Sequence, residues 1–311
     1  MAVRSLIFKI LLLAAVFFAG DFAVFHVLKM GMDKYYGFNK QADILLVGHS
    51  HTVLGIDAEK LEQELEVPVA KYATAGANVL DRYWMLQHYV ESHPGVKFVV
   101  YDVDPRIFDS EGLSSASYTL FLPYLDDQAM SVYMKQEATW QEYYSGKLVR
   151  TTRFRDQTLN IALRGLLDRI ENKKEGRFQV ENVRNYLERE KERSVRINPD
   201  AVQCFRDSIQ YLTDKNIRVI LLFIPIVDLL NDIDPAAQSR VVDIFKDTAQ
   251  ADNVYFFDYN RDYEHDHKLF YDLRHLNNEG NRLVTGRLVA DLRFLINTSG
   301  SADGKTNAQN R

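Results

Sequence analysis

ILLVGHSHTVLGID, residues Ile44–Asp57, begins as a run of apolar residues that ends at Gly48. The run has the length and composition of a strand buried on both faces of a parallel sheet. After the glycine, the letters HSHT place Ser50 between two histidines. Because open α/β sheets bind ligands beyond the carboxyl ends of their strands, Ser50 is a candidate nucleophile rather than an ordinary turn residue.

Four more apolar runs of strand length follow, separated by helical patterns. The strands are expected at Asp43–Val47, Val67–Tyr72, Lys97–Val103, Arg218–Ile224 and Asn253–Asp258. The helices are expected at Asp57–Glu66 and Asp81–Ser92, each starting at a capping aspartate, and at Ala201–Lys215 and Ala236–Ala249. Alternating strands and helices predict an α/β fold. We expect a flavodoxin-like three-layer sandwich with a parallel five-stranded sheet.

Residues from about 109 to 200 interrupt this alternation and predict a helical insertion. The insertion either shapes a site at the sheet edge or is a solvated excursion without a direct role. Helices are expected at Gln128–Tyr144, Asp156–Lys173 and Glu181–Lys191. The basic run Lys147–Arg155, KLVRTTRFR, suits either an anionic polymer or lipid headgroups, or an ordinary solvated helix start.

The N-terminus carries a near-continuous apolar segment of 19 residues from Ile10 to Leu28, interrupted by Asp21 and His26 and close to the about 20 residues that cross a bilayer. Arg4 and Lys9 precede them, which favours a cytoplasmic N-terminus. We expect an uncleaved, single-pass anchor in a bacterial cytoplasmic membrane, with the rest of the chain on the periplasmic or extracellular side. A cleaved signal peptide is the alternative. Asp21 indicates either a segment that ends at the interface or a polar contact with another membrane protein.

The resulting division is an anchor over residues 1–33, an α/β domain over 41–296 and a disordered polar tail over 297–311. The net charge of -5 gives no reason to expect nucleic-acid binding. Cys204 is the single cysteine, so no intrachain disulfide can form. His265 and His267 lack a third ligand at a known spacing, and we predict neither a metal nor a cofactor.

A base for Ser50 follows the fifth predicted strand, in the segment DLRHLNNEG. Asp272 precedes His275 by three residues, which places both side chains on one side of a tight turn. Asp272 can then accept a hydrogen bond from His275 Nδ1 and leave Nε2 free to take the serine proton. Ser50, His275 and Asp272 therefore satisfy the roles of a Ser–His–Asp triad.

The pairing of GHSH with DLRHLNNEG resembles the SGNH, or GDSL-like, hydrolase superfamily, and more narrowly its membrane-anchored members with a G-x-S-H start. The resemblance covers roughly 42–104 and 218–295 and implies Ser50 as nucleophile and Asp272 and His275 as its partners. It also implies an oxyanion hole formed by the N–H groups of Ser50 and Gly76. The family's third-block Asn is absent, since Asp104 lies near that position, and Asn78 is the candidate substitute.

His49, His51 and Asp104 are expected to line the pocket beside the nucleophile. The resemblance implies ester hydrolysis or O-acyl transfer on a cell-envelope polysaccharide or other acylated glycan, through a covalent acyl-enzyme. A multispanning membrane acyltransferase is the partner implied for the anchored members. The alternative function is a non-catalytic envelope assembly or glycan-binding factor that uses the same scaffold.

Overall fold

The computed structural model describes residues 2–109, 117–170, 174–177, 187, 195–231 and 233–298. The chain forms two compact units. A helical unit contains Met1–Asn39 and Ala116–Ile170, and an α/β unit contains Lys40–Ser115 and Glu171–Arg311. This division differs from the one we expected, because it groups much of the insertion with the N-terminal helix instead of with the α/β domain.

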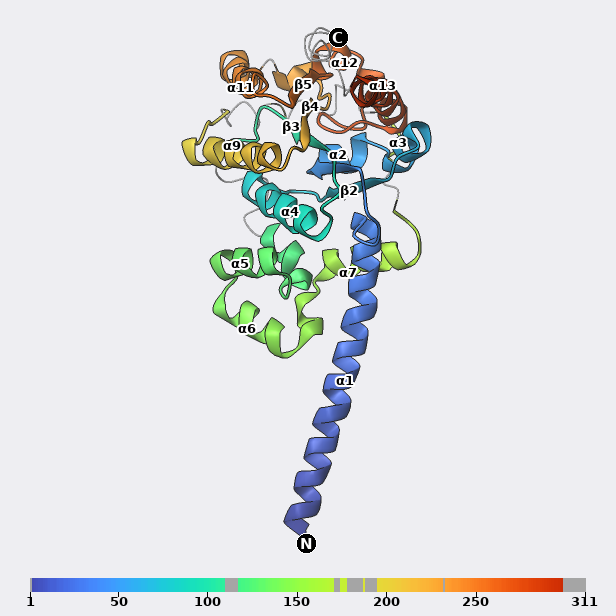
Figure 1. The fold of residues 1–311 in the computed structure, drawn as a ribbon, viewed down its shortest axis with the longest axis vertical. Coiled ribbons are helices and arrows are strands. Elements are labelled where there is room, and N and C mark those ends of the chain that lie inside the picture. The colour runs from blue at the N-terminus through green and yellow to red at the C-terminus, as the bar shows by residue number, and fades with distance from the viewer. Residues whose placement is uncertain are drawn as a thin grey trace. The chain divides into compact units, whose positions relative to one another are not determined.

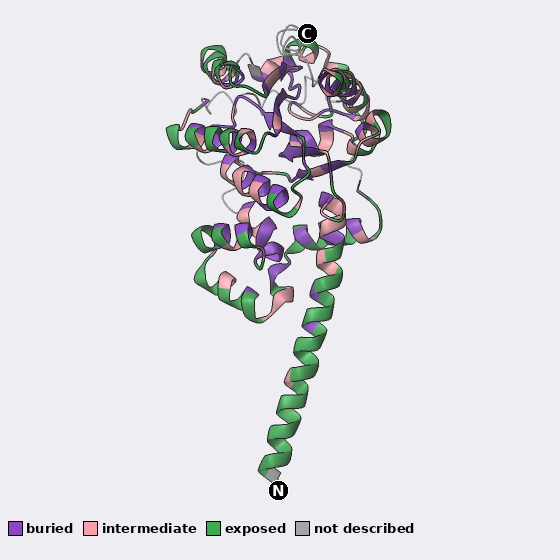
Figure 2. Cartoon of the chain, in the orientation of Figure 1, coloured by how far each residue is buried: buried purple, intermediate pink, exposed green. Residues whose placement is uncertain are grey.

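The α/β unit is built on five parallel strands in the order β2-β1-β3-β4-β5 (Figure 1). Their bounds are β1 Ile44–Gly48, β2 Val69–Ala73, β3 Phe98–Val103, β4 Arg218–Phe223 and β5 Val254–Asp258. Every residue of β1 and β3 is buried, as the continuous apolar runs predicted (Figure 2). The strand order is the flavodoxin-like one, which confirms the expected fold class.

Helices cover both faces of this sheet. On one face α4 packs against α9, and on the other α13 packs against α2 and α3 (Figure 1). The elements are α2 Ser50–Gly55, α3 Ala58–Leu65, α4 Val79–Ser92, α9 Pro199–Asp214, α10 Asp228–Asn231, α11 Pro235–Thr248, α12 Asn260–Tyr263, η4 His267–Leu269 and α13 Asn278–Asn297. Together with the sheet they form the three expected layers.

The capping residues show where the sequence was interpreted correctly and where it was not. Asp57 caps α3 as predicted, since its carboxylate accepts from the Lys60 N–H at 3.0 Å. The prediction that Asp81 starts the next helix is wrong. Asn78 is the N-cap of α4, and Asp81 completes a capping box by accepting from the Asn78 N–H at 2.8 Å.

The helical unit contains α1 Ala2–Tyr36, η1 Ser117–Tyr124, α5 Gln128–Glu137, α6 Trp140–Leu148, η2 Arg150–Arg153 and α7 Asp156–Leu166. The single helix expected over 128–144 is two helices, because Thr139 caps α6 in a capping box with Glu142. The expected helix at 156–173 ends earlier, at Leu166. The predicted helix at 181–191 and most of the predicted tail, residues 299–311, lie outside the described residues.

Within the described residues, Val3–Tyr36 is a helix long and apolar enough to cross a membrane, by length and composition. Figure 2 shows α1 exposed along most of its length. A signal sequence has the same properties. Where α1 crosses α7, two glycines meet, and a Cβ on Gly165 would lie 2.7 Å from the Gly31 carbonyl carbon. The helices approach this closely because neither carries a side chain there.

Asp21 has its polar partners inside the chain. Its carboxylate accepts from the backbone N–H of Arg150 at 2.8 Å and of Thr151 at 2.9 Å, and from the Thr151 hydroxyl at 2.6 Å. These three bonds give the Asp21 carboxylate hydrogen-bond donors within the chain.

Candidate active site

Ser50, His275 and Asp272 form a continuous hydrogen-bonded chain at the carboxyl end of the sheet. Ser50 is the first residue of α2, directly after β1, and its Oγ lies 2.8 Å from His275 Nε2. His275 Nδ1 lies 2.9 Å from both Asp272 carboxylate oxygens. A nitrogen beside a carboxylate carries the proton, so Nε2 is left as the acceptor for the serine hydroxyl. The structure thus brings together the three residues that the sequence singled out.

The loop that carries the acid and the histidine is fixed by backbone and side-chain contacts. Tyr271 N–H donates to the His275 carbonyl at 2.8 Å, and Asp272 Oδ1 accepts from the His275 N–H at 2.9 Å. Burial alone would raise the pKa of Asp272, but the hydrogen bond and charge of His275 outweigh it and the net shift is downward. Asp272 therefore stays ionised and orients the imidazole.

Gly48 is required at the end of β1. A Cβ at this position would lie 2.6 Å from the Asp102 Cβ and would also collide with the Thr52 hydroxyl. The strand can turn into α2 beside these polar groups because the residue has no side chain.

A second histidine–carboxylate cluster lies behind the serine, and the sequence analysis did not identify it. His49 places Nδ1 3.0 Å from Asp102 and Nε2 3.0 Å from Asp104, and all three side chains are buried. The Arg82 guanidinium donates to the Asp102 carbonyl oxygen at 2.5 Å. Asp102 was treated only as a strand residue, although a carboxylate inside a buried strand indicates a buried cationic partner.

Charge balance explains this cluster. Burial opposes a charged His49, but the charge of Asp102 and hydrogen bonding to the two carboxylates raise its pKa above the ordinary value. For Asp102 and Asp104, burial alone would raise the pKa, yet the pairing with His49 lowers the pKa of Asp102 and holds that of Asp104 well below its usual range. His49 Nε2 therefore donates to Asp104, while Nδ1, which lies 3.0 Å from Asp102, accepts from the His51 N–H at 3.2 Å. The Arg82 guanidinium adds positive charge beside both carboxylates.

His51 lies between this cluster and the hydrogen-bonded residues Ser50, His275 and Asp272. Its ring centroid is 4.2 Å from that of His49 and 5.6 Å from that of His275, and it is buried. Among the described residues its Nδ1 has no hydrogen-bond partner. Burial and the neighbouring His49 charge hold the pKa of His51 well below its ordinary value. His51 is thus a neutral imidazole next to Ser50.

A cavity adjoins two of the three predicted pocket residues. His51 and Asp104 line it, as do Arg106 and Arg274. Its apolar wall includes Ile226, Leu230 and Val195. His49 lies behind this lining.

The predicted oxyanion donors are positioned as follows. Gly76 has φ +85°, a left-handed conformation that favours glycine in the turn after β2. Asn78 uses its side-chain oxygen to accept from the Asp81 N–H at 2.8 Å. The Ser50 N–H lies in the first turn of α2, where backbone donors have no partner inside the helix. The role of these groups as oxyanion donors stays a prediction.

Residue types that bind metals occur twice. His49, His51 and Asp102 have ligand atoms within 4.8 Å of one another, but the pairing described above already accounts for their charges. His265 and His267 each lie 2.7 Å from Asp228, a carboxylate partner that the sequence did not reveal. The two contacts tie this loop to Asp228, and the His265 side chain remains 76% exposed.

No family model and no curated protein matches the chain. Solved structures similar to it include an acetyl xylan esterase, at 15% identity and TM-score 0.42, over 79% of this chain and 98% of that one. A GDSL-like lipase from Bacteroides thetaiotaomicron matches at 10% identity and TM-score 0.40, over 82% and 89%. A lipase from a goat rumen metagenome matches at 12% identity and TM-score 0.34, over 79% and 95%.

Similarities at this level assign no function, and the fold is argued from the chain itself. The sheet has the order β2-β1-β3-β4-β5, and the segment after β1 meets the segment after β5 through Ser50 and His275. Both motifs that carried the resemblance lie at this edge of the sheet. The chain therefore has a flavodoxin-like α/β fold that brings both motifs to one edge of its sheet.

Proposed function

We propose that this protein is a serine esterase or O-acyltransferase that acts on an acylated cell-envelope glycan. The observation that carries the proposal is the 2.8 Å contact between Ser50 Oγ and His275 Nε2, with Asp272 on the other ring nitrogen. A serine hydroxyl is activated by an adjacent base that a third group orients, and this chain supplies all three.

The reaction begins when Ser50 Oγ attacks the acyl carbon and His275 Nε2 takes the hydroxyl proton. The tetrahedral intermediate collapses as the C–O bond to the leaving alcohol breaks, and His275 returns the proton to that alcohol. Water or a sugar hydroxyl then attacks the acyl-serine, with His275 again as base, and Ser50 is released. Asp272 stays ionised and stabilises the imidazolium in each step.

The oxyanion requires hydrogen-bond donors that are already in place. We assign the Ser50 and Gly76 N–H groups to this role, with the Asn78 amide as a further candidate. His51 is another candidate, because a neutral imidazole beside the nucleophile can donate one hydrogen bond. Asp104 is held ionised by His49, so it cannot replace the absent Asn.

The envelope location follows from α1. We propose that α1 anchors the protein in a bacterial cytoplasmic membrane with the α/β unit on the periplasmic or extracellular side. There the substrate would be a membrane-proximal polysaccharide, and a multispanning membrane acyltransferase would be a suitable donor of acyl groups. This assignment rests on the length and composition of α1 and on the family resemblance.

A fluorophosphonate probe, which forms a covalent bond to an activated serine, tests the proposal directly. Detergent-solubilised full-length protein should be labelled, whereas Ser50→Ala and His275→Ala should not. Ser92→Ala, an exposed serine of the same unit, is the matched control and should label like the wild type.

Two results would argue against catalysis. One is folded wild-type protein that resists the probe, and the other is labelling that persists in Ser50→Ala. Envelope modification that survives Ser50→Ala in cells would instead support the non-catalytic scaffold.

A further inference from the structure

Within the helical unit, η2 of the insertion is bound to α1 at a defined position along that helix. Burial along α1 begins at Asp21, and the residues from Leu6 to Gly20 are exposed or only partly buried. Asp21 binds the start of η2 through two backbone N–H groups and one hydroxyl. Phe25, one turn further, packs against Phe154 with ring centroids 6.0 Å apart. Thus η2 lies beside the last two turns of the apolar run.

The position of Asp21 on α1 can be converted into a depth below the end of the apolar run. The apolar run ends at Leu28, and Asp21 precedes Leu28 by seven positions. At 1.5 Å of rise per residue, η2 lies about 10 Å below the end of the run. Amphipathic elements that lie in a membrane interface are buried by about 5–10 Å. If α1 spans a bilayer, η2 and the helix that leads into it lie at the interface.

That helix is α6, and its outermost face is apolar. Trp140, Tyr144 and Leu148 are 72%, 63% and 66% exposed and recur every fourth residue. At 100° per residue they form one stripe, opposite the face that buries Gly146. We call Trp140, Tyr144 and Leu148 the α6 stripe. Water-facing helices place polar residues on this face, so the stripe indicates an apolar environment.

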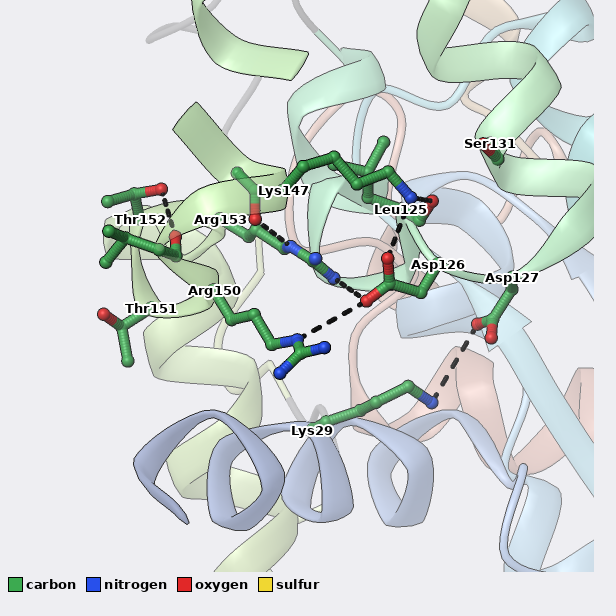
Figure 3. A network of polar contacts seen from close by, with 12 residues as sticks. Lys29, Leu125, Asp126, Asp127, Ser131, Lys147, Arg150, Thr151, Thr152 and Arg153 are labelled. Carbon is green, nitrogen blue, oxygen red and sulfur yellow. Dashed lines mark hydrogen bonds and ion pairs between the residues drawn. The ribbon is translucent and has the colours of Figure 1, made fainter. Parts of the chain in front are cut away.

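Each cation named in the basic run beside the stripe has an acidic partner within the unit. Lys147 and Arg153 each contact the Asp126 carboxylate, at 2.8 and 2.7 Å, and Arg150 approaches it at 3.7 Å (Figure 3). Arg155 pairs with Glu142 at 2.7 Å. The cations that the sequence suggested for anionic ligands thus have acidic partners here. The contact offered by this face is apolar and aromatic.

We propose that the α6 stripe inserts into the interface of the bilayer that α1 spans, so that the helical unit is a membrane-embedded platform. The occupant is lipid, because the stripe adjoins the apolar surface of α1 through η2. Tryptophan and tyrosine are the residues enriched at this depth. Because the cations of the basic run already contact acidic partners, the proposed membrane contact rests on the apolar stripe and not on anionic lipid.

Site-directed spin labelling of the full-length protein tests this depth. Single cysteines replace Tyr144 or Leu148 in a Cys204→Ala background, and the protein is placed in phosphatidylcholine nanodiscs. Leu12→Cys on α1 is the lipid reference, and Gln136→Cys is the matched control on α5, which lies nearer the C-terminal end of α1 (Figure 1). Collisions with oxygen report lipid, and collisions with a polar nickel chelate report water.

Labels at Tyr144 and Leu148 should show an oxygen-to-nickel collision ratio severalfold above that at Gln136, and phosphatidylglycerol should not change it. A ratio equal to that at Gln136 would place the stripe in water and overturn the proposal. Low access to both reagents, or a ratio that requires phosphatidylglycerol, would also overturn it. Loss of lipid access at Leu12 would refute the anchor itself. Fluorophosphonate labelling of the same variants reports on Ser50 separately.

Discussion

Asp104→Asn removes one carboxylate from the buried cluster behind the nucleophile. In the wild type the Asp104 carboxylate accepts from His49 Nε2 at 3.0 Å and from the Arg106 N–H at 2.8 Å. The amide is nearly isosteric, so packing is preserved while the negative charge is lost. His49 would keep Asp102 as its single carboxylate partner. The variant therefore isolates the electrostatic part of the cluster.

The size of the effect follows from burial. Asp104 is 5% exposed, and His49 is 4% exposed. Removing one partner of a buried ion pair costs about 3–5 kcal/mol. Because Asp102 remains, we expect the lower end, about 3 kcal/mol less free energy of unfolding. For a unit of this size 1 kcal/mol shifts the melting temperature by about 2–4 °C, so Asp104→Asn should melt about 6–12 °C lower.

The difference in free energy of unfolding between the wild type and Asp104→Asn should depend on pH. The pKa of Asp104 is depressed in the fold, so its contribution is present above about pH 3.9 and is lost as the pH falls. The pKa of His49 is raised, so its contribution is full below about pH 6.5 and is lost as the pH rises through the raised value. The difference in free energy of unfolding between the wild type and the variant is therefore largest between about pH 4 and 6.5.

Thermal unfolding followed by tryptophan fluorescence measures this difference. The chain has two tryptophans, and a Trp140→Phe background leaves Trp84 on α4 as the reporter of the α/β unit. Asp207→Asn, an exposed acid on α9, is the control and should melt like the wild type. An Asp104→Asn variant with wild-type melting, or with a difference in melting temperature that does not change from pH 5 to 9, would refute the stabilising pairing of His49 with Asp104.

Three further predictions concern the site and the anchor. Asp272→Asn should fold normally yet lower the rate of fluorophosphonate labelling about 10³–10⁴-fold, because the imidazole loses its orienting carboxylate; an unchanged rate in this variant would count against the triad. Gly48→Ala should lose several kcal/mol in urea unfolding, since its Cβ would lie 2.6 Å from the Asp102 Cβ, and wild-type stability would contradict that contact. Asp21→Ala should leave the Thr151 N–H and hydroxyl without their acceptor and expose the insertion to limited proteolysis, whereas an unaltered digestion pattern would show that the bond does not hold it.

The site residues that could be predicted lie close in sequence either to a predicted strand or to one another. Ser50 follows one strand directly, and Asp272 and His275 are three residues apart. The strands themselves were visible as continuous apolar runs, because a parallel sheet is buried on both faces. Once the sheet is parallel, its carboxyl ends share one edge, so the distance of 225 residues between Ser50 and His275 did not hide the contact.

The parts that could not be predicted depend on which strands and helices lie side by side. His49 meets Asp102 and Asp104 because β1 pairs with β3, a neighbour 53–55 positions away in sequence. Asp21 meets Thr151 across 130 residues, and no local pattern indicates that partner. Both contacts replace solvation lost by a buried charge, which is why each charge required a partner even though the sequence did not name it.

By itself the sequence therefore determined the strands, the fold class and the two motifs of the candidate site, since these follow from burial periodicity and short spacings. Tertiary structure decided the protonation of His49 and His51, the internal pairing of the basic run, and the grouping of the insertion with α1. Those properties depend on charges and donors brought within a few ångströms by packing, and electrostatic energies change steeply with distance and burial. Neither the distance between two charges nor their burial can be derived from composition or from the spacing of residues in the sequence.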